Sequence, residues 1–358
     1  MEKLSNSIYT GTWDEGHIQG IAVDTQRKFI YCSFTTCLVK LDMQGNLVGS
    51  VHGLIGHLGC LDFNDQDGRV YGSLEFKNDC IGQGILSRLS HTSPVQEGFY
   101  IAIFDVDKIV RPQMDAEADG IMTAVYLKDV VDDYQAAWTQ DGKEIKHRYG
   151  CSGIDGLAFG PSFGLSKNTK YYLHVAYGIY GDLERTDNDY QVILEYDVSN
   201  WTKYERSLQQ ENMHHIGPER FRQRYFVFTG NTEWGIQNLE YDEYTGNWLM
   251  AVYRGRKPEY PNYSMFLIDG HAEPSEKPLQ GFSVPQTGCV ASLVHAGLHD
   301  DKSGIYGWEF PYGSTGIFSL GNGYFYFSQD RREASGYSST IRLYQWTGKA
   351  PSPFELVE

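Results

Sequence analysis

The amino-acid sequence predicts an all-β fold built from a repeated unit. Of the 358 residues, 26 are tyrosine and 39 are glycine, and aromatic residues make up 14% of the chain. Tyrosine and β-branched residues recur in short alternating runs, which is the pattern of strands separated by turns. One such run occurs in two similar versions: "YTGTWDEGHIQGIAVD" from Tyr9 to Asp24 and "FTGNTEWGIQNLEYD" from Phe228 to Asp242. A repeat of this length indicates that the fold itself repeats.

Three further segments align with these two: "HLGCLDF" from His57, "GIDGLAF" from Gly153 and "GSTGIFS" from Gly313. One aligned column is small in four of the five segments, and the column after it is always Ile or Leu. The members of the small column are Gly20, Cys60, Gly156, Asn238 and Gly316. Period-two alternation with a small residue indicates inner strands at a point where backbones approach closely.

More strand patterns follow each aligned segment. After the first come "KFIYCSF", "CLVKLDMQG" and "NLVGSV", and comparable runs follow the other four. Five units of about four strands predict a β-propeller of five four-stranded blades around a central channel. A pair of β-sandwiches, or a propeller of six or seven blades with one degenerate, are the alternatives. We assign "QGFSV" (280–284) as the outer strand of the fourth blade, while "CVASLVH" (289–295) is a further strand pattern without an assigned place.

The blades are expected to form one unit. A single blade cannot bury its own faces, so residues 1–358 are predicted to fold as one β-propeller domain. The early segment "SIYTGTW" resembles "YFVFTGNTEW", which is assigned as an outer strand. It is therefore expected to close the ring by pairing with the last blade. The alternative is that "PFELVE" closes the ring, or that both segments add to that blade.

Charge and cysteine content limit the function classes. The net charge is −16, from 30 basic and 46 acidic residues, and such a surface repels phosphate backbones and anionic membranes. We therefore expect neither a nucleic-acid nor a membrane partner, and no stretch approaches the roughly 18 apolar residues of a membrane span. The start "MEKLSNSIYTGTW" has no secretory pattern. The six cysteines form no Cys-x-x-Cys pair and are predicted to be free thiols, which favours the cytoplasm: Cys32, Cys37, Cys60, Cys80, Cys151 and Cys289.

The five-unit pattern resembles the β-propeller superfamily. In architecture it is similar to five-bladed, sugar-active propellers such as the arabinanase-like glycoside hydrolases. The resemblance covers most of the chain but rests on strand pattern, because the Trp-Asp signature of WD40 blades, the double glycine of kelch blades and the Asp box of sialidases do not occur. It implies an architecture, and no catalytic residue is transferred from it.

Candidate catalytic residues follow from the repeat instead. The starts of the innermost strands surround one mouth of the channel, where propeller ligands usually bind. The residues predicted to carry acid–base chemistry there are His17, His57, Asp155 and Glu75. The residues predicted to bind ligand beside them are Gln19, Gln237 and Asn238. No cofactor is identified, but His17 and His57 occupy equivalent positions in adjacent blades and predict a divalent metal in the channel. The alternative is that each histidine caps a turn or fills the channel through water.

A second set of polar residues lies at the far ends of the next strands. These strands run antiparallel to the innermost ones, so their ends should reach the same face. The ligand-binding residues predicted here are Tyr180, Asp182, Arg254, Gln329 and Asp330. The alternative for each is a solvated hairpin loop with local ion pairs, which contribute little to stability.

Two functions fit this pattern. The first is an intracellular enzyme, a hydrolase or lyase, that processes a carbohydrate or uronate at the channel mouth. The second is a non-catalytic propeller that binds a ligand or a protein through the same mouth. Two carboxyl groups about 5 to 9.5 Å apart would favour hydrolysis. A histidine-centred site with one carboxylate would favour a lyase or a metal site, and an apolar mouth would favour binding.

Overall fold

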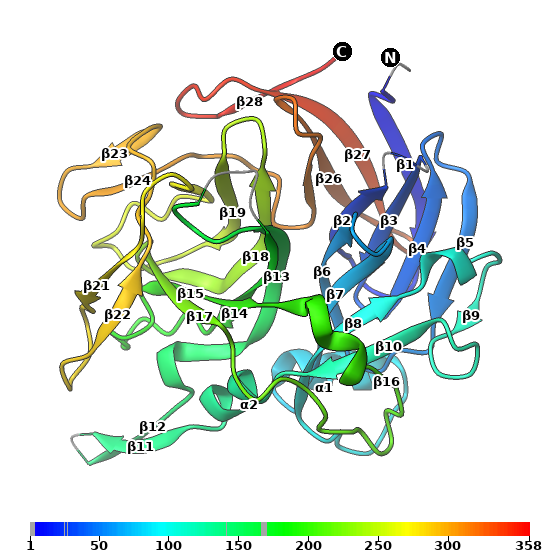
Figure 1. Cartoon of the computed structure of the whole chain (residues 1–358), viewed down its shortest axis with the longest axis horizontal. Helices are drawn as coiled ribbons and strands as arrows, with labels where there is room; N and C mark the ends of the chain where they lie inside the picture. The colour runs from blue at the N-terminus through cyan, green and yellow to red at the C-terminus, as the bar shows by residue number, and fades with distance from the viewer. Residues whose placement is uncertain (1–3, 25, 27, 141, 166–169) are drawn as a thin grey trace.

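The protein is a five-bladed β-propeller (Figure 1). The computed structural model describes residues 4–24, 26, 28–140, 142–165 and 170–358. The innermost strands are β2 (Ile18–Asp24), β6 (His57–Asn64), β13 (Cys151–Pro161), β18 (Thr232–Asp242) and β25 (Ile317–Ser319). These are the five segments that the repeat predicted, so the repeat identified the centre of the ring.

Two further antiparallel strands follow in every blade. The second strands are β3 (Phe29–Phe34), β7 (Arg69–Phe76), β14 (Tyr171–Ile179), β19 (Asn247–Arg254) and β26 (Tyr324–Glu333). The third strands are β4 (Cys37–Asp42), β8 (Gly98–Phe104), β15 (Tyr190–Tyr196), β20 (Met265–Ile268) and β27 (Gly336–Trp346). All of them carry the alternating pattern from which they were predicted.

The outer edges of the blades are less regular. The outer strands of the first three blades are β5 (Leu47–His52), β10 (Met122–Tyr126) and β17 (Gln223–Phe228). Short strands extend these sheets: β9 (Met114–Asp115), β16 (Arg206–Ser207), β22 (Thr287–Val290) and β21 (Ser275–Pro278). Two hairpins stand apart from the blades: β11 (Ala137–Gln140) with β12 (Lys143–Lys146), and β23 (Leu298–Asp300) with β24 (Ile305–Gly307).

The fourth blade departs from the prediction. Residues 280–284, assigned as its outer strand, form a loop without strand pairing. The unplaced segment after them begins with the last two residues of β22, which pairs in parallel with β17 and so belongs to the third blade. The outer position of the fourth blade is instead filled by isolated bridges from Leu293 and Trp308 to β20. Alternation alone could not separate these cases, since a strand pattern does not say which sheet it joins.

Both ends of the described chain complete the fifth blade. Strand β1 (Ser7–Trp13) pairs antiparallel with β27, and β28 (Phe354–Leu356) also pairs with β27. The two termini accordingly lie close together in Figure 1. The ring is therefore closed by β1 and β28 together, which is one of the arrangements predicted from the sequence.

The small-residue column packs blade against blade. A Cβ atom on Gly20 would lie 2.8 Å from the Cα of Cys60, and one on Gly156 would lie 3.1 Å from the carbonyl oxygen of Ile236. A Cβ on Gly316 would lie 3.1 Å from the side chain of Ile21. Each glycine therefore faces the next blade around the ring, although Gly316 lies one residue before β25 and not within an inner strand as expected.

Helices are few and short. The α-helices are α1 (Cys80–Arg88) and α2 (Lys128–Tyr134), and the 3-10 helices are η1 (Val106–Lys108), η2 (Arg148–Gly150) and η3 (Val198–Lys203). Within the described residues, none of these helices has the length and apolar character of a membrane span. All six cysteines are free thiols in the structure.

Candidate functional site

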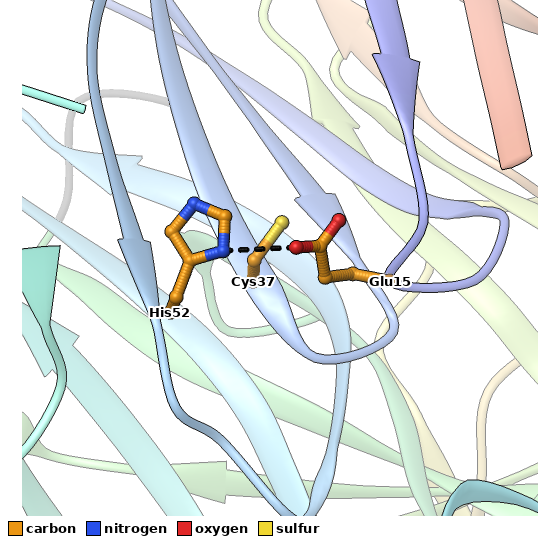
Figure 2. A group of neighbouring side chains, drawn as sticks. All are labelled: Glu15, Cys37 and His52. Atoms are coloured by element: carbon orange, nitrogen blue, oxygen red, sulfur yellow. Dashed lines mark hydrogen bonds and ion pairs between the residues drawn. The ribbon is translucent and has the colours of Figure 1, made fainter. Parts of the chain in front are cut away.

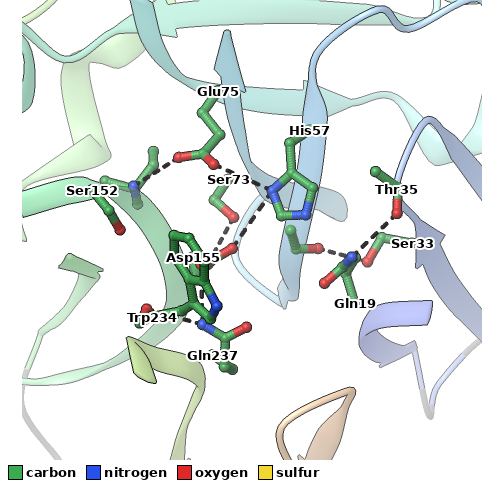
Figure 3. Close-up of polar contacts among 12 residues, drawn as sticks. Gln19, Ser33, Thr35, His57, Ser73, Glu75, Ser152, Asp155, Trp234 and Gln237 are labelled. Carbon is green, nitrogen blue, oxygen red and sulfur yellow. Dashed lines mark hydrogen bonds and ion pairs between the residues drawn. The ribbon is translucent and has the colours of Figure 1, made fainter. Parts of the chain in front are cut away.

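Six of the predicted residues line a single cavity at one mouth of the channel, and Figure 3 labels all of them except His17. They are His17, Gln19, His57, Asp155 and Gln237, together with Glu75 from the second strand of the second blade. The cavity has a volume of about 300 Å³. The further lining residues are Thr35, Lys77, Cys80, Ile81, Gly84, Ile85, Arg88, Trp234 and Tyr253. The structure thus brings together all four candidates for acid–base chemistry.

A β-bulge in the inner strands directs these side chains inward. In β2 the pairing steps from Ile18 to Gly20, which leaves Gln19 without a residue opposite it. The same shift of register flanks Asp155 in β13 and Gln237 in β18. Bulges of this kind often re-aim a side chain next to an active site. The aligned polar column of the sequence is therefore a column of bulged residues.

His57 is placed between two carboxylates. It faces Glu75 across the β6–β7 pair, and its Nδ1 lies 3.4 Å from Glu75 Oε1 and 3.6 Å from Asp155 Oδ1. Burial alone would lower the pKa of His57, but the contact with Glu75 and the charge of Asp155 outweigh it and raise that pKa. In Figure 3 the second ring nitrogen points away from the carboxylates, toward the side where Gln19 lies.

Glu75 is fully engaged by other groups. Its Oε1 lies 2.6 Å from Lys77 Nζ, and its Oε2 accepts a hydrogen bond from the Ile154 amide at 3.1 Å. Lys77 also donates to the Ser152 carbonyl oxygen at 2.8 Å. Burial would raise the pKa of Glu75, but Lys77 and His57 hold it below the usual value. Glu75 therefore stays ionised as a buried partner of His57 and Lys77.

Asp155 is the more adaptable carboxyl group. Its Oδ2 accepts a hydrogen bond from Gln237 Nε2 at 3.1 Å, and Gln237 also donates to the Trp234 carbonyl oxygen at 3.0 Å. Burial raises the pKa of Asp155 to about 7, against the lowering effect of His57. Near neutral pH the group is therefore present in both protonated and ionised forms, which suits proton transfer.

His17 contributes a neutral imidazole. Burial, followed by the charges of His57 and Arg88, lowers its pKa to about 4. The Gln19 amide nitrogen lies 3.3 Å from His17 Nε2 and donates to Thr35 Oγ1 at 3.2 Å. This side of the cavity is thus a set of neutral hydrogen-bonding groups opposite the charged cluster.

Helix α1 covers one side of the cavity. Its N-cap is Asp79, whose side chain accepts hydrogen bonds from the amides of Ile81 and Gly82. Cavity-lining side chains from this helix include Ile81, Ile85 and Arg88. No helix was expected here, although an N-capping Asp before apolar residues four apart is a start signal that could have indicated one. Glycines within the segment weaken that signal.

Trp234, the aromatic residue of the cavity wall, has an uncommon backbone conformation. Trp234 lines the cavity with a φ of 63°, in the left-handed region that bulky residues rarely adopt. Its ring contacts Tyr180, with the two ring centroids 5.7 Å apart. Such backbone strain concentrates at functional sites, where surrounding structure holds it in place.

Asn238 lies outside the cavity. It is completely buried, and its amide nitrogen donates to the carbonyl oxygens of Gln19 at 2.9 Å and Ser314 at 3.2 Å. The Cys60 thiol donates to its side-chain oxygen. These contacts join segments from four blades at the channel, so the side chain ties the ring together rather than facing a ligand.

Tyr180 contacts the cavity wall from behind, whereas Asp182 lies in an exposed turn. Tyr180 donates a hydrogen bond to Asp79 Oδ2 at 2.9 Å and so supports the start of helix α1. Asp182 is exposed and accepts from the Glu184 amide within a turn. The structure thus brings Tyr180 near the site but not Asp182.

The remaining predicted residues are distributed around the rim. Arg254 is exposed and donates to the Asn262 carbonyl oxygen. Gln329 donates to the Tyr344 hydroxyl at 2.7 Å, and Asp330 is exposed at the end of the second strand of the fifth blade. None of these three side chains lines the cavity. Strand ends that share a face need not share a pocket, because the blades diverge from the axis.

The histidines of the cavity have partners other than a metal. His17 Nε2 faces Gln19, and His57 Nδ1 faces two carboxylates. In the described part of the chain, the three His, Cys, Asp or Glu side chains that do converge are Glu15, Cys37 and His52, elsewhere in the first blade. Among the described residues, no three ligand atoms that include those of both His17 and His57 lie within 4.8 Å of one another, and the channel metal stays a prediction.

Comparisons with known proteins add only a distant likeness in fold. No protein-family model matches the chain, and no curated protein matches its sequence. A solved structure of the soluble aldose sugar dehydrogenase from Escherichia coli is 9% identical, with a TM-score of 0.40 over 97% of this chain and 99% of that one. The β-propeller domain of Cps50 (Swd1) from Myceliophteria thermophila is 10% identical, with a TM-score of 0.32 over 92% and 98%. A functionally unknown protein from Desulfotomaculum acetoxidans is 8% identical, with a TM-score of 0.36 over 95% and 69%.

Proposed function

We propose that the cavity is the active site of a lyase. It uses acid–base chemistry to break a carbon–oxygen bond of a small uronate by elimination. The observation that carries the proposal is the position of His57. Two carboxylates hold one ring nitrogen, within 3.6 Å, while the other nitrogen points away from them and makes no hydrogen bond to another described residue. An imidazole oriented in this way is the usual general base of proteins.

The reaction needs one base and one acid. The free nitrogen of His57 takes the proton from the carbon next to the substrate carboxylate, and the electron pair forms a carbon–carbon double bond as the neighbouring carbon–oxygen bond breaks. The departing oxygen takes a proton from Asp155, which the pKa of about 7 keeps partly protonated at neutral pH. Glu75 stabilises the imidazolium that forms, and Lys77 keeps Glu75 ionised and in place.

Elimination fits the carboxyl groups better than hydrolysis does. Hydrolysis of a glycoside by the common route uses two carboxyl groups that both reach the substrate. Glu75 is 3% exposed and is already bonded to Lys77 and the Ile154 amide. That leaves Asp155 as the reactive carboxyl group, beside a histidine.

The lining favours a small, anionic, hydroxyl-rich molecule. Arg88 supplies a cation for a carboxylate, while Gln19 and Gln237 supply amides for hydroxyl groups. Trp234 supplies an aromatic face for a sugar ring. A volume of about 300 Å³ lies at the small end of ligand cavities. The cytoplasm is the location we propose for this activity, on the basis of the six free thiols.

The second candidate is a non-catalytic propeller that binds a similar ligand. It is supported by the lack of a complete hydrogen bond to His57 Nδ1 among the described residues. Catalytic contacts are, however, often long before a substrate is bound. The two candidates differ in whether a bound uronate is converted.

The test uses digalacturonate and a 4-linked glucuronate disaccharide as probes. Calorimetry measures binding, and ultraviolet absorbance of the new conjugated double bond measures elimination. We expect turnover by the wild type and at least a hundredfold loss in His57→Gln, a range typical of a lost general base. His299→Gln, on an exposed hairpin, is the matched control and should behave as the wild type. Binding without product would favour the second candidate, and full turnover by His57→Gln would refute the proposed role.

A further inference from the structure

Three side chains of metal-ligating types converge in the first blade (Figure 2). Glu15 precedes β2, Cys37 begins β4 and His52 ends β5. One ligand atom from each lies within 4.8 Å of the others, and His52 Nδ1 is 2.9 Å from Glu15 Oε1. Figure 2 shows the thiol of Cys37 between the imidazole and the carboxylate.

We infer that Glu15, Cys37 and His52 form a zinc site with a fourth position open to water. A thiolate, an imidazole and a carboxylate are the three kinds of ligand that zinc takes in proteins. Thiolate and carboxylate together carry two negative charges, which balance the dication. The thiol is fully buried and lies at the bottom of the site, while the other two side chains are about a quarter exposed. Metal can therefore enter from the solvent side.

A supporting contact fixes the ring of His52. Its Nε2 lies 2.8 Å from Ser50 Oγ, which also accepts a hydrogen bond from the Gln113 amide at 3.0 Å. A ligating histidine normally uses its other ring nitrogen in this way, because that hydrogen bond selects the tautomer and the ring orientation. In the structure Nδ1 donates to Glu15 Oε1 at 2.9 Å. When a metal binds, the ring proton is carried on Nε2, which then donates to Ser50 Oγ and leaves the Nδ1 lone pair for the metal.

The site lies next to the acid–base cavity along the chain. Glu15 is two residues before His17, and its carbonyl oxygen accepts a hydrogen bond from Arg88 at 3.1 Å. A metal bound here ties the segment before β2 to β4 and β5. Its role is to hold one wall of the cavity, and it takes no part in the proton transfers proposed above.

Cobalt substitution tests the site without knowledge of the substrate. Full-length protein is dialysed against chelator, titrated with Co²⁺ and then with Zn²⁺ in competition. We expect one equivalent of Co²⁺ with a thiolate-to-cobalt absorption band, and a rise in Tm when Zn²⁺ binds. Cys37→Ser should lose the band. His52→Gln should keep its fold and bind Zn²⁺ at least tenfold more weakly, and Ser50→Ala should weaken binding by about 10- to 100-fold.

Two other cysteines provide matched controls. Cys32→Ser changes a buried thiol of the same hydrophobic cluster, and Cys80→Ser changes the exposed thiol of helix α1. Both variants should keep the cobalt band. The zinc site is refuted if the wild type gives no thiolate band, or if Cys80→Ser removes it as Cys37→Ser does. Loss of binding in His57→Gln but not in His52→Gln would place the metal in the cavity instead and would equally refute the assignment.

Discussion

The ammonium group of Lys77 lies 2.6 Å from the carboxylate of Glu75, and both side chains are almost completely buried. Burial of either charge alone is costly, whereas together they leave Glu75 ionised beside His57. The orientation of the histidine therefore depends on a lysine that makes no contact with the reacting atoms in the proposed mechanism. Lys77 is a positioning residue in this sense.

Loss of Lys77 should destabilise the fold strongly. Lys77→Met leaves the Glu75 carboxylate buried without its cation, which typically costs about 3–5 kcal/mol of unfolding free energy. Urea denaturation measures the change. The control is Lys128→Met, because Lys128 pairs with Asp132 on an exposed helix surface and should cost less than about 1 kcal/mol.

The double variant Lys77→Met/Glu75→Gln separates charge from packing. Replacing both members of a buried pair is often close to neutral, so the double variant should be more stable than Lys77→Met alone. A double variant as unstable as the single one would show that packing of the lysine stem, and not the unpaired carboxylate, accounts for the loss.

The contribution of Asp155 to stability should fall as the pH rises from about 4 to about 7. The Asp155 carboxyl group has an ordinary pKa of 3.8 in the unfolded chain and about 7 in the fold, so the folded state binds the proton more tightly. The stability from this proton is complete below pH 3.8 and is lost as the pH passes 7. Asp155→Asn should therefore reduce the difference between unfolding free energies at pH 5 and pH 8.

Part of that difference should remain in the variant. Burial also raises the pKa of Asp62, at the other end of the channel, to about 7, so it titrates in the same direction. Asp62→Asn serves as the comparison, and the two variants together should flatten the profile further than either alone. A profile unchanged by Asp155→Asn would contradict the raised pKa.

The small column should not accept even one methyl group. In Gly20→Ala the new Cβ would lie 2.8 Å from both the Cα of Cys60 and the amide nitrogen of Leu61, and these backbone atoms cannot rotate aside. Overpacking of this kind costs about 1–3 kcal/mol. Gly84→Ala is the control, because nothing lies within 4 Å of its Cβ and the residue is helical, so it should stabilise by about 0.5–1 kcal/mol. Thermal melts of both variants should shift in opposite directions.

The sequence repeat predicted the parts of the fold that are the same in every blade. The inner strands and the channel-mouth residues could be found because Gln19, Asp155 and Gln237 stand at one aligned position. Asn238 shows the limit of that reasoning, since the same alternation that pointed Gln237 into the cavity turned its neighbour toward other blades. The position of the β-bulge decides whether a polar side chain faces the cavity or the backbone of another blade. The alternation of apolar residues in the sequence does not reveal where a bulge occurs.

Features that occur once were harder to predict. Helix α1 interrupts a strand series with a segment containing two glycines. Lys77 reaches the Ser152 carbonyl oxygen only because β7 and β13 come together in space. The group of Glu15, Cys37 and His52 is likewise spread over 38 positions with no close ligand spacing. Such contacts cannot be predicted from the spacing of residues in the sequence, because they form only when the strands are assembled into sheets.

Because β1 pairs with β27, the fifth blade cannot be completed until β27 has been synthesised. Thr10 is synthesised long before its partner, because its hydroxyl bonds to Ser339, 329 positions later. Strand β1 therefore stays unpaired while the first four blades are synthesised. Contacts of such long sequence separation form slowly. During that interval its edge is exposed to other nascent copies, so a chaperone that shields an extended segment would shorten the most hazardous stage of biogenesis. A circular permutant opened between β1 and β2 would place that strand after its own partner and remove the wait.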